Sequence, residues 1–226
     1  MRNLVIASHP DDEVLGCGGT IARLAAEGHE VYIAILGEGI SSRYPQREQA
    51  DPSLLQTLRA CGHRVAKLLG AKELFLYNLP DNRFDTIPLL NIVKIIEDLV
   101  EKLAPEAIYT QHGGDLNIDH GLVYRATLTA ARPIAGAPVK AVYAYEVPSS
   151  TEWAFQKFDP QFRPNLFLDI SQTLEMKIQA IHLYESETRL FPHPRSPEAL
   201  RANAYRWGSV AGLKAAEAFE VIRDVR

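Results

Sequence analysis

The sequence has few cysteines and no long apolar segment. Cys17 and Cys61 are the only cysteines among its 226 residues, which excludes a disulfide framework as a source of stability. The longest apolar runs, such as residues 31–36, have the length of a strand and are far too short to span a bilayer. An apolar run starts at residue 4 and leaves no room for a signal peptide. We therefore expect a cytoplasmic protein with no membrane-spanning segment.

The sequence also lacks a large excess of charge of either sign. It has 24 lysines and arginines against 28 aspartates and glutamates, a formal net charge of −4 at pH 7. Binding to nucleic acid or to an anionic membrane needs a strongly basic surface, so we expect a small-molecule partner and no nucleic acid. With 46% hydrophobic residues, the chain can form one domain, residues 1–226, around a substantial core. A homo-oligomer is compatible with this composition.

Strand and helix patterns alternate over the first two thirds of the chain. Predicted strands cover residues 4–8, 30–36, 74–77 and 107–110. Predicted helices cover residues 20–27, 54–69, 88–103 and 119–131. This alternation is typical of an α/β fold with a Rossmann-like, mostly parallel sheet and helices on both faces. The polar stretch 37–52 is long for a connection and is a candidate to cover a site.

The pattern changes after residue 133. Strands are expected at residues 139–145 and 166–170, and Ser171 is placed to cap a helix that continues to about residue 184. A further helix is expected at about 198–205, and residues 219–225 could form a closing strand. Residues 211–218 have a helical or irregular pattern.

Three polar clusters follow predicted strands or lie in loops. The first contains His9, Asp11 and Asp12, directly after the first strand. The second spans residues 112–120, after the strand at 107–110, and the third is the loop 191–197. Because the carboxyl ends of parallel strands share one edge of the sheet, the first two clusters are expected to converge there.

The residue types in these clusters suit a catalytic zinc ion. Such an ion usually takes three protein ligands and leaves one position for water, and His9, Asp12 and His120 would supply two imidazoles and a carboxylate. Fe²⁺ or Co²⁺ could use the same ligands. Asp11 cannot easily bind the same ion, because successive side chains diverge. It is free to accept a proton from the metal-bound water.

Each of these residues also has a simpler interpretation when it is taken alone. Paired aspartates after a strand commonly cap a helix, and His120 could be a surface residue at a helix start. Asp119 is expected to cap the helix that it begins, and it could also support the ligands from behind. Amide hydrolysis further needs a proton donor for the leaving amine, for which His112, His193 and Asp119 are the nearby groups.

Two segments resemble the signatures of a known family. SHPDDE at residues 8–13 and GGDLNIDH at residues 113–120 resemble those of the zinc-dependent N-acetylglucosaminyl-phosphatidylinositol deacetylase-like family, also called the LmbE-like family. A weaker resemblance extends over nearly the whole chain. It implies a Rossmann-like fold and hydrolysis of the N-acetyl group of an amino sugar. It also implies that His9, Asp12 and His120 bind zinc and that Asp11 is the general base.

The second signature departs from the family pattern at one position. Many members have His-Pro-Asp-His there, and the first histidine helps to protonate or stabilise the intermediate, but this chain has Asn117. Asparagine can donate a hydrogen bond to an oxyanion but cannot act as an acid. The proton role therefore passes to His193 or His112, or the proton returns from Asp11. We favour His193, because its loop also carries Arg195 and could close over the sugar.

The sequence thus predicts a zinc-dependent hydrolase of an N-acetylated sugar or its conjugate, with Asn117 or His193 stabilising the oxyanion. One alternative is a metal-dependent hydrolase of another bond, such as a phosphoester, which would need a second metal about 3.5–4 Å from the first. The other is a sugar-binding relative that has lost catalysis. The intact His9, Asp11, Asp12 and His120 argue against that alternative, and Asn117 argues for it.

Overall fold

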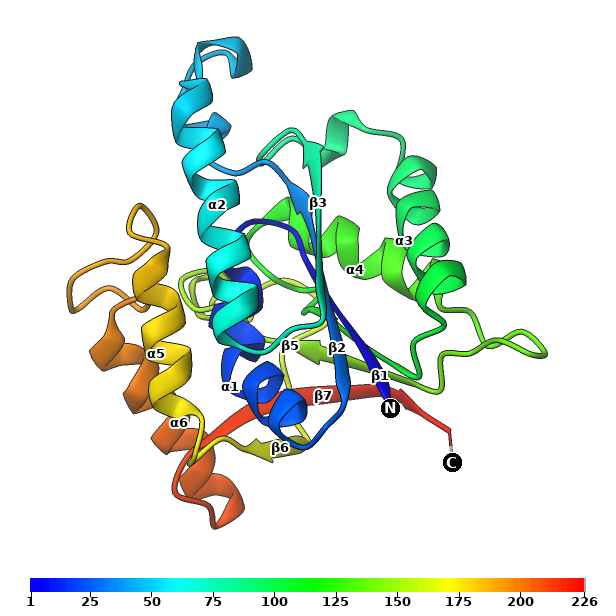
Figure 1. Cartoon of the computed structure of the whole chain (residues 1–226), viewed down its shortest axis with the longest axis vertical. Coiled ribbons are helices and arrows are strands. Elements are labelled where there is room, and N and C mark those ends of the chain that lie inside the picture. The colour runs from blue at the N-terminus through cyan, green and yellow to red at the C-terminus, as the bar shows by residue number, and fades with distance from the viewer. Residues whose placement is uncertain (226) are drawn as a thin grey trace.

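A seven-stranded sheet forms the centre of the computed structural model, which describes residues 1–225 (Figure 1). In sheet order β3-β2-β1-β4-β5-β7-β6, the first five strands are parallel and β7 runs antiparallel to both of its neighbours. The strands are β1 (Arg2–Ala7), β2 (Glu30–Gly37), β3 (Glu73–Leu79), β4 (Ala107–Gln111), β5 (Ala141–Tyr145), β6 (Leu166–Asp169) and β7 (Ala216–Asp224). The predicted mostly parallel α/β sheet is confirmed.

Helices cover both faces of this sheet (Figure 1). One layer contains α1 (Asp12–Ala26), α2 (Pro52–Leu68), α5 (Leu174–Leu183) and α6 (Pro197–Ala211), and the other contains α3 (Leu89–Leu103) and α4 (Ile118–Ala130). Alternate residues of β1 face the two layers: Val5 and Ala7 belong to the first core, Leu4 and Ile6 to the second. Burial on both faces explains why the central strands are continuous apolar runs. Among residues 1–225, every helix is too short or too polar to reach across a bilayer.

Helix α1 begins at Asp12, whereas the sequence predicted a start at residue 20. The glycines after Glu13 gave a loop signal, but they lie inside the helix. Glycine is needed there because α1 packs very closely on its neighbours. A Cβ added to Gly16 would lie 2.1 Å from Tyr145 Cδ2. A Cβ on Gly19 would lie 2.7 Å from Ile170 Cγ2. The glycine-rich motif therefore serves close packing, which brings Asp12 into the first turn of a buried helix.

A buried ion pair between Lys177 and Glu217 packs against the middle of α1. Lys177 Nζ donates to the Leu15 carbonyl at 2.8 Å and to Glu217 at 2.6 Å. Glu217 accepts from the backbone N–H of Gly19 at 2.9 Å and of Thr20 at 2.7 Å. The Leu15 carbonyl and the Gly19 amide are partners in a regular helix, but here each also bonds a charged side chain. Strand β7 and helix α5 are thereby tied to α1.

The last third of the chain differs from expectation in two places. Ser171 does not cap a helix: α5 follows Thr173, and Ser171 Oγ bonds Asp169 at 2.5 Å. The segment 211–218, expected to be helical or irregular, is divided: α6 ends at Ala211, Gly212 follows with a φ of 72°, residues 212–215 are irregular, and β7 begins at Ala216. The predicted closing strand is confirmed with an earlier start. Short 3₁₀ turns complete the described chain: η1 (Ser41–Arg43), η2 (Arg47–Gln49), η3 (Phe84–Thr86) and η4 (Glu152–Ala154).

Candidate metal centre and active-site cleft

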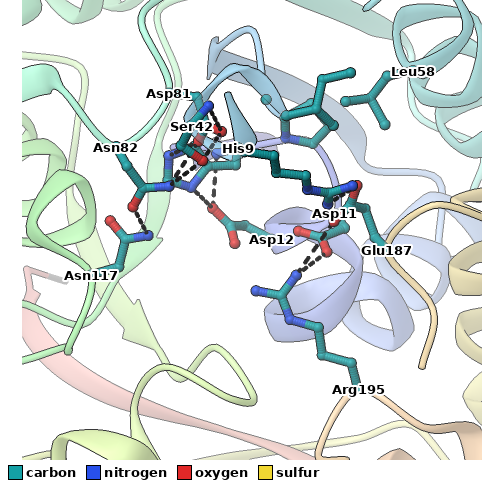
Figure 2. Close-up of a pocket in the computed structure, with 14 residues that line it drawn as sticks. His9, Asp11, Asp12, Ser42, Leu58, Asp81, Asn82, Asn117, Glu187 and Arg195 are labelled. Carbon is teal, nitrogen blue, oxygen red and sulfur yellow. Dashed lines mark hydrogen bonds and ion pairs between the residues drawn. The ribbon is translucent and has the colours of Figure 1, made fainter. Parts of the chain in front are cut away.

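A cleft opens at the carboxyl ends of β1 and β4, where the direction of strand order reverses. Open α/β sheets bind their ligands at this point. Its inner compartment has a volume of about 180 Å³. Figure 2 shows its lining, which includes His9, Asp11, Asp12, Ser42, Leu58, Asp81, Asn82, Asn117, Glu187 and Arg195. The stretch 37–52, expected to cover a site, contributes Gly39, Ile40, Ser42 and Arg43 to this wall.

The three predicted ligands lie together. One ligand atom from each of His9, Asp12 and His120 lies within 4.8 Å of the others, and all three residues are buried. His120 Nε2 lies 3.3 Å from Asp12 Oδ2, yet it is buried and has no hydrogen-bond partner in the described chain. Buried polar atoms are rarely left unpaired. A metal ion held by this set would satisfy that nitrogen, so the donor set and its geometry fit a divalent cation.

The electrostatics of this set also favour a cation. Burial alone would lower the pKa of His120, but Asp12 and Asp115 outweigh it and raise that pKa to about 9. Burial likewise opposes protonation of His9, yet hydrogen bonds to Asp119 and Asp12 raise its pKa well above the usual value. In this cavity, negative charge therefore stabilises a positive charge at the imidazoles, the place where a metal ion would lie.

Carboxylates hold both candidate imidazole ligands from behind. His9 Nε2 lies 2.9 Å from Asp119 Oδ2, and His120 Nδ1 lies 3.1 Å from Asp115 Oδ2. Such partners fix the orientation of a metal-binding histidine. They leave His9 Nδ1, 3.5 Å from Asp12 Oδ2, and His120 Nε2 for a metal.

A second group, His9, Asp81 and Asp119, also has its ligand atoms within 4.8 Å. Its carboxylates accept hydrogen bonds, as Asp12 does in the first group: Asp81 Oδ2 accepts from Ser42 Oγ at 2.6 Å, and Asp119 Oδ1 accepts from the Phe84 N–H at 3.0 Å. Among the described residues this group has no unpartnered buried nitrogen or oxygen. It therefore supports the ring of His9, and the set with His120 is the better candidate.

Asp11 has an unusual backbone conformation beside the candidate ligands. Its φ of 104° is rare for a residue other than glycine. The Asp11 N–H donates to Glu13 Oε2 at 3.1 Å, and Glu13 Oε1 accepts from the Tyr184 hydroxyl at 2.7 Å. Burial raises the pKa of Asp11, and the neighbouring Arg195 opposes this shift. In Figure 2, the Asp11 carboxylate contacts Arg195, whereas the Asp12 carboxylate contacts His9. The two carboxylates therefore diverge, as the sequence predicted.

Arg195, in the loop between α5 and α6, connects Asp11 with the loop after β5. Its Nη1 donates to Asp11 Oδ2 at 2.7 Å, and its Nε donates to Ser149 Oγ at 2.8 Å. Nearby, Arg43 Nη2 donates to both oxygens of Glu187 at 2.7 and 2.6 Å, and Arg195 lies 3.8 Å from the same carboxylate. These contacts bring three loops that are distant in sequence to one wall of the cleft.

An outer compartment of about 430 Å³ adjoins the inner one. The two share Arg43, Asn82, Asn117, Glu187 and Arg195. His193 lies in the outer compartment and not in the lining of the inner one. Its ring packs edge-on against Trp153, with centroids 5.2 Å apart. Burial, then Arg195 and Arg189, lower the pKa of His193.

The sequence places this protein in a known family. A family model described as PIG-L, GlcNAc-PI de-N-acetylase, matches residues 4–131. The chain belongs to the PIG-L family. It is 28% identical over 197 residues to the uncharacterized deacetylase YaiS of Escherichia coli, covering 81% of this chain and 90% of that protein. It is 27% identical over 214 residues to a 4-oxalmesaconate hydratase of Pseudomonas putida, covering 83% and 77%.

A solved structure shows the same fold as this PIG-L family chain. The N,N'-diacetylchitobiose deacetylase of Pyrococcus horikoshii superposes with a TM-score of 0.78 at 21% identity, covering 98% of this chain and 84% of that one. The likeness extends far beyond residues 4–131. The β5–β7 half, which supplies Ser149 and Arg195 to the cleft, is therefore part of the shared fold.

The structure also places Asn117 and His112, two other predicted site residues of this PIG-L member. Asn117, and not Asp119, caps α4: its Oδ1 accepts from the Asp119 N–H at 2.9 Å. Asn117 Nδ2 donates to Asn82 Oδ1 at 2.9 Å at the cleft surface. His112 is not brought to the cleft, because its ring nitrogens lie 3.0 Å from Glu220 and 2.8 Å from the Pro160 carbonyl.

Several residues that shape the site were missed at the sequence level. Asp115 lies inside the second signature, so its place beside His120 could have been suspected from proximity. Asp81 follows β3 at the same sheet edge, and a turn signal concealed it. Arg43 and Glu187 are separated by 144 residues, and no sequence signal connects them.

Proposed function

We propose that this protein is a zinc-dependent deacetylase that hydrolyses the N-acetyl group of an amino sugar conjugate. The observation that carries the proposal is the buried, unpartnered His120 Nε2 facing Asp12 and His9, with Asp11 beside them. Membership of a family described by de-N-acetylation supports the reaction. We also propose that the chain acts as one catalytic domain, because Glu187 and Arg195 complete the cleft that begins at His9.

His9, Asp12 and His120 would hold the metal ion. When bound, such an ion polarises a carbonyl group and makes water nucleophilic at neutral pH. Zinc suits the two imidazoles and one carboxylate, and Fe²⁺ or Co²⁺ are the alternatives for the same ligands. Asp115 and Asp119 keep the two rings in their ligating orientation.

Asp11 is the proposed base. It accepts a proton from the attacking water while the water oxygen bonds to the acetyl carbon. The carbon–nitrogen bond then breaks, Asp11 returns the proton to the amine nitrogen, and acetate and the free amine leave. This assignment replaces the expected donor His193, because His193 lines the outer compartment whereas Asp11 lines the inner one. Asn117 lies where the two compartments meet and would hydrogen-bond the substrate.

Measurement of acetate release tests the proposal. Purified protein, with its metal content determined, is incubated with N-acetylated sugars, sugar nucleotides and sugar lipids, and acetate and free amine are quantified. We expect both products in equal amounts, loss of activity with a chelator, and recovery with Zn²⁺. A metal-loaded protein that releases no acetate contradicts the proposal. Hydration of a double bond, the reaction named for the P. putida relative, would give no acetate, and a phosphoesterase would need two metals per chain.

Replacing Asp119 by Ala is expected to weaken metal binding by about 10–100-fold, the usual effect of losing a partner that orients a ligating histidine. The reason is that His9 would lose its 2.9 Å contact to Asp119. Competition with a chromophoric chelator measures this affinity. Asp85→Ala is the control, because Asp85 is exposed and outside the ligand set. Unchanged affinity in Asp119→Ala would show that His9 is oriented by other contacts.

A further inference from the structure

The size of the inner compartment implies that the substrate extends beyond it. Its volume of about 180 Å³ is below the roughly 300–1,000 Å³ of typical small-molecule sites. The outer compartment, about 430 Å³, shares five lining residues with it. A sugar whose acetamido group reaches Asp11 must therefore place its remaining part in the outer compartment.

The outer compartment is rich in cationic hydrogen-bond donors. Arg43, Arg189 and Arg195 line it, against a single carboxylate, Glu187, which gives three positive charges and one negative charge. Glu187 is already engaged by Arg43 and by Ser186 Oγ. Arg195 is paired with the buried Asp11 at 2.7 Å, so within residues 1–225 Arg189 is the arginine of this compartment that lacks a carboxylate partner, and its charge leaves the compartment net positive.

The arginines keep free donors. Within residues 1–225, Arg43 side-chain hydrogen bonds use Nη2 alone, and those of Arg195 use Nε and Nη1. Arg189 is exposed and donates, through Nη1, to the carbonyls of Ser186 and Thr188. An arginine has five N–H donors and no acceptor, so donors on all three side chains remain for a ligand.

His193 adds a neutral donor with a fixed direction. Its Nδ1 accepts from the Arg195 backbone N–H at 3.1 Å, so the neutral ring carries its proton on Nε2. Trp153 packs against this ring, and with Leu116 it gives the compartment an apolar side. The walls thus combine a carbon-binding surface with several donors and few free acceptors.

We propose that the outer compartment binds an anionic group, a carboxylate or a phosphate, on the part of the substrate beyond the amino sugar. The assignment rests on the proposed deacetylase function and adds the chemical class of the conjugate. Arg43, Arg189 and Arg195 bind the anionic oxygens, His193 donates from Nε2, and Trp153 and Leu116 contact the linking carbons. Arginine is well suited to both anions, because its planar donor fork matches their oxygens.

Three N-acetylglucosamine conjugates test the assignment: the methyl glycoside, the glycolic acid glycoside and the 1-(methyl phosphate). We expect kcat/KM to be about tenfold or more higher for an anionic conjugate than for the neutral one, as one charge-assisted contact provides. The preferred anion identifies carboxylate or phosphate. Arg189→Gln should reduce this preference several-fold, whereas Arg132→Gln, the same charge change outside the cleft, should preserve it.

Binding provides a second readout. Calorimetry on metal-loaded Asp11→Asn should give a lower Kd for the anionic conjugates than for the methyl glycoside, and added salt should reduce the difference. Equal kcat/KM and equal Kd for the three conjugates would overturn the anionic assignment and leave the deacetylase function standing. Release of acetate from none of them by the metal-loaded wild type would overturn the deacetylase function, and this assignment with it.

Discussion

Asp11→Asn is expected to lower kcat by about 10²–10⁴-fold, the usual contribution of a general base, while the metal stays bound. The substitution keeps the shape of the side chain but removes its ability to accept a proton. His9, Asp12 and His120 are untouched, so the metal content per chain should equal that of the wild type. Steady-state acetate release and elemental analysis of the same preparation measure the two effects.

The matched control for this substitution is Asp85→Asn. It makes the same chemical change at an exposed aspartate that lies outside the cleft, and we expect near wild-type kcat. If Asp11→Asn also retained near wild-type kcat, another group would have to be the base. If it lost its metal, Asp11 would belong to the ligand set, and the division of roles between Asp11 and Asp12 would be wrong.

Lys177→Met is expected to lower the free energy of unfolding by about 3–5 kcal/mol, as found when one partner of a buried ion pair is removed. Lys177 and Glu217 are 5% and 4% exposed. Without the ammonium group, Glu217 keeps its charge in the interior with only two backbone N–H partners, and the Leu15 carbonyl loses a donor. Equilibrium denaturation in urea, followed by circular dichroism, measures the loss.

Two further variants make this prediction specific. Lys94→Met changes a lysine whose side chain is 63% exposed, so we expect an effect within about 0.5 kcal/mol. The double variant Lys177→Met/Glu217→Gln should lose less stability than the sum of the two single variants, because no unpaired charge remains. A Lys177→Met protein with the urea midpoint of the wild type would show that the pair contributes nothing to stability.

Much of the fold could be predicted because each signal was local. The apolar runs of β1 and β2, and the helix expected at residues 54–69 and found as α2, depend on neighbouring residues alone. The start of α1 could not be predicted, since the glycines at 16 and 19 signal a loop unless Tyr145 and Ile170 are known to pack on them. Close approach between distant elements leaves no trace in the local pattern.

The convergence of the candidate ligands could also be predicted from the sequence. His9, Asp12 and His120 were recognisable because metal-binding residue types followed two strands whose carboxyl ends meet at one sheet edge. The position of His193 was not, because it depends on how the loop 191–197 packs against Trp153. Asp119 was expected to cap α4, but a carboxylate with two neighbours, His9 and the Phe84 amide, is drawn inward. Asn117 then caps the helix.

The order of the cleft residues along the chain has a consequence for how selectivity can change. The candidate ligands and Asp11 all lie at or before His120, whereas Ser149, Trp153, Arg189 and His193 belong to later loops. Insertions or exchanges in those loops would change the walls of the outer compartment and leave the candidate ligands and Asp11 in place. Arg195 is the constraint on such exchange, because a replacement loop must still deliver a cation to Asp11. Loop grafting that keeps this arginine is therefore a direct route to redesigned specificity.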